Sequence, residues 1–88
     1  MENNLIQIIE AALLSASRPL SVEEIQKLFS EGNVPNKEEI RDTLDEIESL
    51  CSNRGVELKR VSSGFRMQVK QSLSGYIAKL WEEKPQRY

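Results

Sequence analysis

The residues that could take part in catalysis are three pairs of adjacent glutamates, Glu23-Glu24, Glu38-Glu39 and Glu82-Glu83, and one cysteine, Cys51. Paired carboxylates can act as general acid and general base, and a thiolate can act as a nucleophile. However, the sequence contains no histidine, which excludes a Ser-His-Asp triad, a Cys-His pair and a Cys/His zinc site. The first two glutamate pairs fall in the first turns of predicted helices, where the positive end of the helix dipole stabilises negative charge. We therefore interpret them as capping residues and Cys51 as a small core residue, and predict no catalytic, metal or cofactor site.

The composition describes one small domain in a reducing compartment. A chain of 88 residues and 10.1 kDa buries roughly 60 to 68% of its unfolded surface, enough for one thin core. One cysteine cannot form a disulfide within the chain, which favours a cytoplasmic location. The sequence contains no apolar run of about 18 residues, and its start is acidic, so we expect neither membrane insertion nor export.

The N-terminal two thirds of the sequence predicts three helices. Apolar residues recur at three- and four-residue steps from Asn4, which predicts a first helix ending near Ser17, before a proline. Ser21 with a glutamate three residues later forms a capping box, which predicts a second helix of about two and a half turns that stops by Gly32. Asn36 repeats the capping pattern and begins a third amphipathic helix that reaches about Asn53.

The remainder predicts a hairpin and a last helix. From Val56 to Val69 the apolar period changes to two, and a turn at 62–64 containing Gly64 separates the two strands. Helical spacing returns from Ser72, and we interpret the aromatic residues of this helix, Tyr76 and Trp81, as packing residues. Three helices, a two-stranded wing and a C-terminal helix indicate an α+β winged helix over residues 1–84, with a helix-turn-helix core.

The third helix is strongly acidic. In a DNA-binding winged helix this element would lie in the major groove. Between Lys37 and Ser52 six acidic side chains oppose two basic ones, a net charge of −4, so phosphate repulsion would oppose docking. A solvated helix face above a core stripe is the simpler interpretation.

The predicted hairpin is basic. The segment contains five basic residues and one acidic residue, Glu57. Four of the basic residues could make weak, nonspecific contacts with DNA or bind an acidic partner: Lys59, Arg60, Arg66 and Lys70. Lysine and arginine on edge strands also prevent strand-to-strand aggregation, and that alternative stays open.

The first helix is more apolar than one core face requires. Only Gln7 and Glu10 are clearly polar between Leu5 and Leu14, and a chain this small cannot surround its own first helix. We expect a homodimer contact there, with these interface candidates: Leu5, Ile8, Ile9 and Ala12. A broad core stripe with some exposed leucines is the alternative.

Several segments together resemble one bacterial family. They are the opening Leu5–Ser21, with its Glu-Ala-Ala-Leu-Leu and Pro-Leu-Ser pieces, Arg54-Gly55-Val56-Glu57-Leu58, Gly64-Phe65-Arg66-Met67 and Glu83-Lys84-Pro85. Their order and spacing are similar to the N-terminal domain of the segregation and condensation protein B family over nearly the whole chain. Ala12, Ser15 and Ser63 depart from the family pattern, which affects the expected dimer packing and the wing turn.

The resemblance implies a non-enzymatic, homodimerising subunit of the condensin-like complex that contains an SMC ATPase and the kleisin, segregation and condensation protein A. It also implies that residues 85–88 begin a linker to a second winged-helix domain, which would make the main kleisin contacts, with the ATPase reached indirectly. The expected location is the nucleoid. A winged-helix transcriptional regulator is the alternative, and it would need Arg, Lys, Asn or Gln toward the bases, where this third helix carries Glu and Asp.

Overall fold

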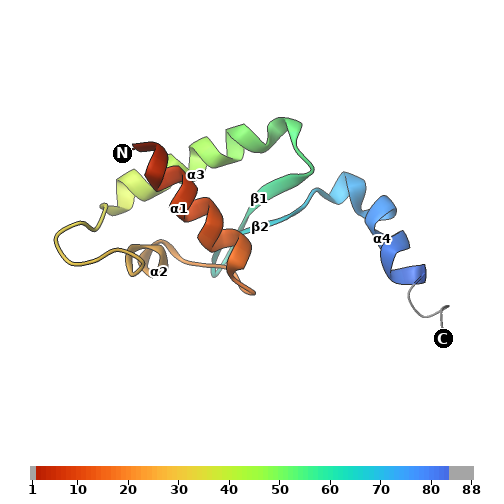
Figure 1. The fold of residues 1–88 in the computed structure, drawn as a ribbon, viewed down its shortest axis with the longest axis horizontal. Coiled ribbons are helices and arrows are strands. Elements are labelled where there is room, and N and C mark those ends of the chain that lie inside the picture. The colour runs from red at the N-terminus through yellow and green to blue at the C-terminus, as the bar shows by residue number, and fades with distance from the viewer. Residues whose placement is uncertain (1, 84–88) are drawn as a thin grey trace.

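Three helices, a wing and a projecting fourth helix make up the fold (Figure 1). The computed structural model describes the backbone of residues 2–83 and the side chains of residues 4–81. The elements are α1 (Glu2–Ser15), α2 (Val22–Gln26), α3 (Lys37–Leu50), the 3₁₀ turn η1 (Cys51–Asn53), β1 (Val56–Val61), β2 (Gly64–Val69), the 3₁₀ turn η2 (Gln71–Leu73) and α4 (Ser74–Glu83). This order confirms the predicted α+β winged helix. Within the described residues no helix is both long and apolar enough to cross a membrane.

Both predicted capping boxes are present, and they fix where α2 and α3 begin. The Ser21 hydroxyl accepts from the Glu24 backbone N–H at 3.1 Å, while the Glu24 carboxylate accepts from the Ser21 N–H at 2.9 Å. Asn36 and Glu39 repeat this reciprocal pair at 2.8 and 2.9 Å. Each pair satisfies backbone donors that the first helical turn leaves without partners.

The second helix is shorter than predicted. It ends at Gln26, because the N–H groups of Lys27, Leu28 and Phe29 each bond to a carbonyl three residues back instead of four. These tighter turns take the chain out of the α-helix and into an extended loop that reaches α3. The prediction of a stop at Gly32 was therefore wrong by one and a half turns, whereas α1 and α3 end close to where the sequence places them.

The core lies where α1, α2, α3 and the inner face of the wing meet. Its fully buried members come from all three helices: Ile9 from α1, Ile25 from α2, and Ile40, Leu44 and Ile47 from α3. The buried Thr43 hydroxyl donates to the Glu39 carbonyl at 2.8 Å, so its polar atom has a partner. Cys51 closes the stripe of α3, and burial raises the pKa of its thiol, as expected of a core residue.

Besides the core contacts of its inner face, the wing is joined to the segment before α2 by an isolated backbone bridge. Strands β1 and β2 pair in antiparallel register from Val56↔Val69 to Val61↔Gly64. Leu20, just before α2, exchanges backbone hydrogen bonds with Phe65 at 2.8 and 2.9 Å. This antiparallel bridge pairs one residue outside the hairpin with β2. Gly64 adopts a φ of +146° next to this bridge, which confirms the predicted positive φ.

Helix α4 projects away from the rest of the fold (Figure 1). It contacts the η2 turn that leads into it, and four large apolar side chains form one exposed stripe along it: Tyr76, Ile77, Leu80 and Trp81. We call these four residues the α4 stripe. The sequence predicted that Tyr76 and Trp81 pack, but within this chain they are 74 and 63% exposed.

Candidate interaction surfaces

The two faces of the wing differ in what their cations can contact. Lys59 and Arg66 are register partners, so they share the face that alternates with buried Leu58. Arg60 lies on the other face, together with Leu58 and Phe65. Strand alternation therefore directs Arg60 toward the body, and leaves Lys59 and Arg66 on the outer face.

Arg60 is engaged with the acidic helix instead of being presented on the wing. Its guanidinium donates to the carboxylates of Asp45 and, at 3.3 Å, Glu48, and it lies 5.4 Å from the ring centre of Phe65. The hydrogen bonds that Arg60 donates to Asp45 and then to Glu48 raise the pKa of Arg60. Lys70 is also engaged, because its ammonium donates to the Ser52 carbonyl at 2.8 Å. Arg66 donates its Nε–H to the side-chain carbonyl of Gln68 at 3.1 Å, so three of the four wing cations predicted to contact a partner have a hydrogen-bond acceptor within the chain.

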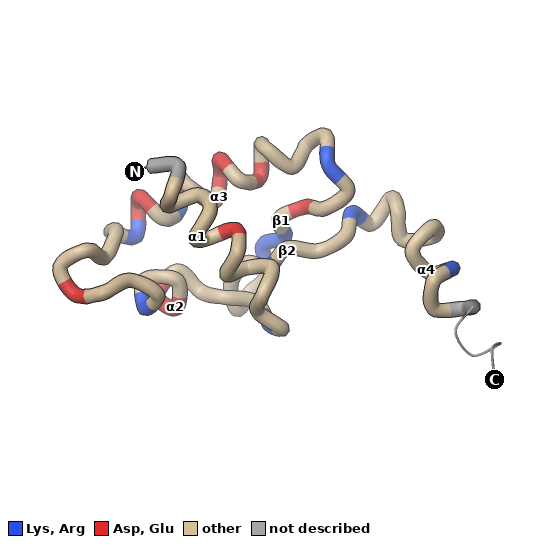
Figure 2. The backbone as a smooth tube through the Cα atoms, in the orientation of Figure 1, with Lys and Arg blue, Asp and Glu red and all other residues tan. Residues whose placement is uncertain are grey.

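The acidic surface of α3 remains on the exterior. Figure 2 shows Asp and Glu positions along α3, and the remaining carboxylates there are exposed: Glu38, Glu39, Asp42 and Glu46. This is the helix that DNA-binding relatives of the fold place in the major groove. Its negative charge opposes that use.

The structure divides the four predicted interface residues of α1 into accessible and inaccessible ones. Ile8 is 37% exposed, and Leu5 and Ala12 are half-buried. Ile9 is fully buried in the core, so it offers no surface to a second copy. The correction follows from helix geometry, since successive residues are about 100° apart and only one of the pair Ile8 and Ile9 can face the core fully.

A groove runs between the start of α1 and the loop after α2. It has a volume of about 500 Å³, and its apolar lining is Leu5, Ile8, Phe29, Val34 and Pro35. We call these five residues the α1 groove. The Gln26 side-chain amide donates to the Pro35 carbonyl at 3.1 Å, which ties the loop to α2. Sequence reasoning found Leu5 and Ile8 but missed the loop residues, which carry no periodic signal.

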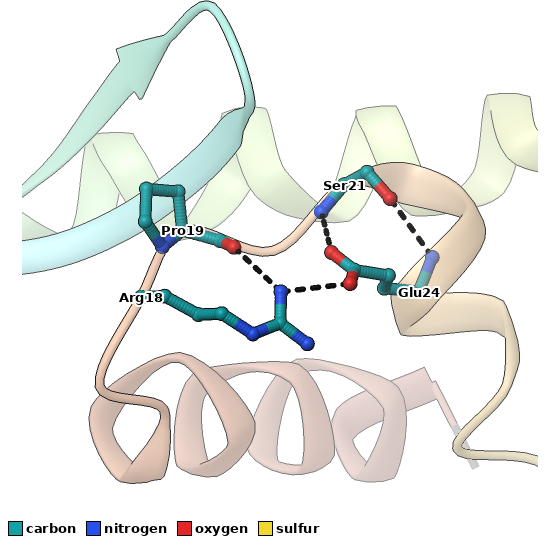
Figure 3. A network of polar contacts seen from close by, with 4 residues as sticks. All are labelled: Arg18, Pro19, Ser21 and Glu24. Atoms are coloured by element: carbon teal, nitrogen blue, oxygen red, sulfur yellow. Dashed lines mark hydrogen bonds and ion pairs between the residues drawn. The ribbon is translucent and has the colours of Figure 1, made fainter.

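The first glutamate pair has a structural explanation. Glu24 completes a capping box and also binds Arg18 at 2.7 Å, and Arg18 in turn donates to the Pro19 carbonyl at 3.2 Å (Figure 3). The hydrogen bond from the Ser21 backbone, followed by that from Arg18, lowers the pKa of Glu24. Its neighbour Glu23 binds Lys37 at 3.0 Å, which lowers the pKa of Glu23.

Of the other predicted chemical groups, Glu39 caps α3 as its sequence pattern indicates. The side chains of Glu82 and Glu83 lie outside the described residues. Within the described part, no three side chains of Cys, Asp or Glu gather so as to hold a metal ion.

We expect the Arg18–Ser21–Glu24 network to make stability depend on acid pH. Folding lowers the pKa of Glu24 from its ordinary value of 4.5, so this contribution is fully present above pH 4.5 and is lost as the pH falls from there through the lowered pKa of the folded state. Urea unfolding followed at several pH values should show a smaller loss of stability on acidification for Glu24→Gln than for the wild type. Glu31→Gln, an exposed loop variant, serves as the control. Equal acid sensitivity of Glu24→Gln and wild type would contradict this role.

The arrangement defines a class of protein: a winged helix whose recognition-helix position is acidic and whose exposed apolar surfaces suit contacts with other protein chains. The family model for segregation and condensation complex subunit ScpB matches residues 7–88. The chain therefore belongs to the ScpB family.

Individual relatives agree with this family. A segregation and condensation protein B homolog from Coxiella burnetii (strain RSA 493 / Nine Mile phase I) is 42% identical over 81 residues, and the match covers 92% of this chain and 39% of that protein. The crystal structure of ScpB from Mycobacterium tuberculosis matches 94% of this chain and 51% of its own, with a TM-score of 0.83 and 20% identity. A dimer of a ScpB N-terminal domain complexed with a ScpA peptide has a TM-score of 0.77 at 23% identity, covering 89% of this chain and 95% of that one.

Proposed function

We propose that this chain is a non-catalytic, homodimerising part of a segregation and condensation complex that works on the bacterial chromosome at the nucleoid. Family membership supports the complex. The observation that carries self-association is the α4 stripe, because Tyr76, Leu80 and Trp81 each expose more than 60% of their surface. Large adjoining apolar side chains of this kind mark protein interaction sites.

We propose that the kleisin, ScpA, is the second partner. The structurally similar ScpB N-terminal domain was crystallised as a dimer with a ScpA peptide, which supports a kleisin contact for this chain. The sequence prediction assigned that contact mainly to a second domain. The SMC ATPase would then be reached through the kleisin.

DNA readout is the weaker alternative. The acidic surface of α3 and the use of Arg60 within the chain both work against it. Lys59 and Arg66 remain candidates for weak, salt-sensitive contact with DNA or with an acidic partner.

The solution mass tests the proposed self-association. We expect multi-angle light scattering of the 88-residue chain to give a dimer near twice 10.1 kDa at micromolar concentrations and above. The apolar side chains of the α4 stripe are the physical reason, because their burial is favourable at about 25 cal/mol per Å². A mass of 10.1 kDa throughout a concentration series would overturn the proposal.

A further inference from the structure

We propose that the two copies of the dimer exchange their last helices, so that the α4 stripe of each copy lies in the α1 groove of the other. This inference rests on the proposed dimer and names the surfaces that form it. It joins two exposed apolar features of the molecule, neither of which the other elements of the described chain cover.

The first argument is the position of the two surfaces. The groove is formed by the start of α1 and the loop between α2 and α3, at one end of a fold 53 Å long. Helix α4 projects from the opposite end (Figure 1). In the described conformation the helix therefore cannot reach the groove of its own chain. A second copy placed antiparallel alongside the first brings each α4 next to the groove of its partner.

The second argument is the area that a stable dimer needs. Given the exposed fractions of the α4 stripe, one helix offers about 400 Å², since a buried aromatic side chain covers about 150 to 250 Å². Pairing two α4 helices with each other would bury about 800 Å² in total, which is the size of a crystal contact. Reciprocal docking buries both grooves as well as both helices, so it covers more surface than pairing of the helices alone and exceeds the size of a crystal contact.

The third argument is the match in chemistry. The larger part of the groove lining is apolar, beside the polar residues Asn4, Asn33 and Glu39, and Val34 within it is 44% exposed. A helix with apolar residues at i, i+1, i+4 and i+5 is the kind of ligand that apolar grooves bind. The arrangement is isologous: each copy gives one helix and one groove, so the contact closes after two chains.

Complementation between two variants tests the exchange. Val34→Asp places a charge in the groove, and Leu80→Asp places one on α4; both residues are exposed, so both variants should fold, as judged by circular dichroism and thermal melting. Each alone should dimerise at least tenfold more weakly than the wild type, because both of its contacts contain a charge facing apolar surface. An equimolar mixture retains one unaltered contact, between the groove of the Leu80→Asp chain and the α4 of the Val34→Asp chain. The mixture should therefore form heterodimers more tightly than either variant forms homodimers.

Val61→Asp, at the tip of the wing, is the matched control, because it makes the same change as Val34→Asp at a residue of similar exposure, 37% against 44%, that belongs to neither surface. It should dimerise like the wild type. Wild-type dimerisation by Val34→Asp would overturn the exchange, and so would a mixture that gains no heterodimer. A wild-type chain that stays monomeric would overturn the dimer itself, so the two failures are distinct.

Discussion

Replacement of Ile9 by aspartate is expected to unfold the domain. Ile9 is fully buried among α1, α2 and α3, with no partner there for a charge. A lone buried carboxylate must either stay ionised at a large desolvation cost or take up a proton, and it also leaves the apolar contacts of isoleucine unmade. We expect a loss of more than about 4 kcal/mol, against a total stability of about 4 to 13 kcal/mol for a domain of this size.

The neighbouring residue provides the matched control. Ile8→Asp makes the same chemical change on the same helix, but Ile8 is 37% exposed and its charge can reach water. Urea unfolding monitored by circular dichroism at 222 nm should give no cooperative transition for Ile9→Asp, and a cooperative transition for Ile8→Asp whose midpoint falls only by the stabilisation that the dimer contact at the α1 groove provides. A folded Ile9→Asp would contradict the assignment of Ile9 to the core.

This pair of residues also shows what the sequence could not resolve. The apolar residues of α1 extend most of the way around the helix, so periodicity alone does not say which of them face inward. The angle is set by contacts with α3 and the wing, which are distant in sequence. Where the pattern has one clear face, as in α3, the predicted stripe and its cap were both confirmed: Asn36 begins the helix and Ile40, Leu44 and Ile47 are buried.

The wing could be predicted further than it was. Alternation alone places Arg60 on the side of Leu58 and so toward the body, away from Lys59. Its partners Asp45 and Glu48 come from α3, and their identity depends on how the wing packs on that helix. The shortness of α2 had no comparable signal, because Leu28 and Phe29 continue its apolar spacing and only the local hydrogen bonds show that the helix has ended.

The surfaces proposed for partners were the least predictable part. The α4 stripe has the spacing of an ordinary amphipathic helix, which predicts burial but not by which chain. The α1 groove depends on the loop residues Val34 and Pro35, whose position is set by the Gln26 amide and by the cap at Asn36. Sequence periodicity describes faces of single elements, whereas a groove is made by elements that meet.

Substitution of Gly64 by alanine is expected to break the backbone bridge between the wing and the segment before α2. A Cβ at this position would overlap the backbone carbonyl group of Leu20 and come within 2.8 Å of the Ser21 nitrogen. The φ of +146° is in addition a conformation that residues with a side chain rarely adopt. Relief of the overlap requires the strand to move, which breaks the two hydrogen bonds between Leu20 and Phe65. Backbone strain and two lost hydrogen bonds together correspond to about 3 kcal/mol.

Gly75→Ala is the control, because a Cβ on Gly75 meets no atom within 4 Å and alanine favours a helix over glycine. It should leave the melting temperature of the domain unchanged or raise it, while Gly64→Ala should lower the melting temperature by more than about 10 °C. Amide hydrogen exchange locates the damage: in Gly64→Ala, the N–H groups of Leu20 and Phe65 should exchange faster relative to those of α3. Unchanged protection of these two amides would mean that the bridge tolerates a side chain at position 64. The close approach of β2 to the segment before α2 would then not explain the glycine at position 64.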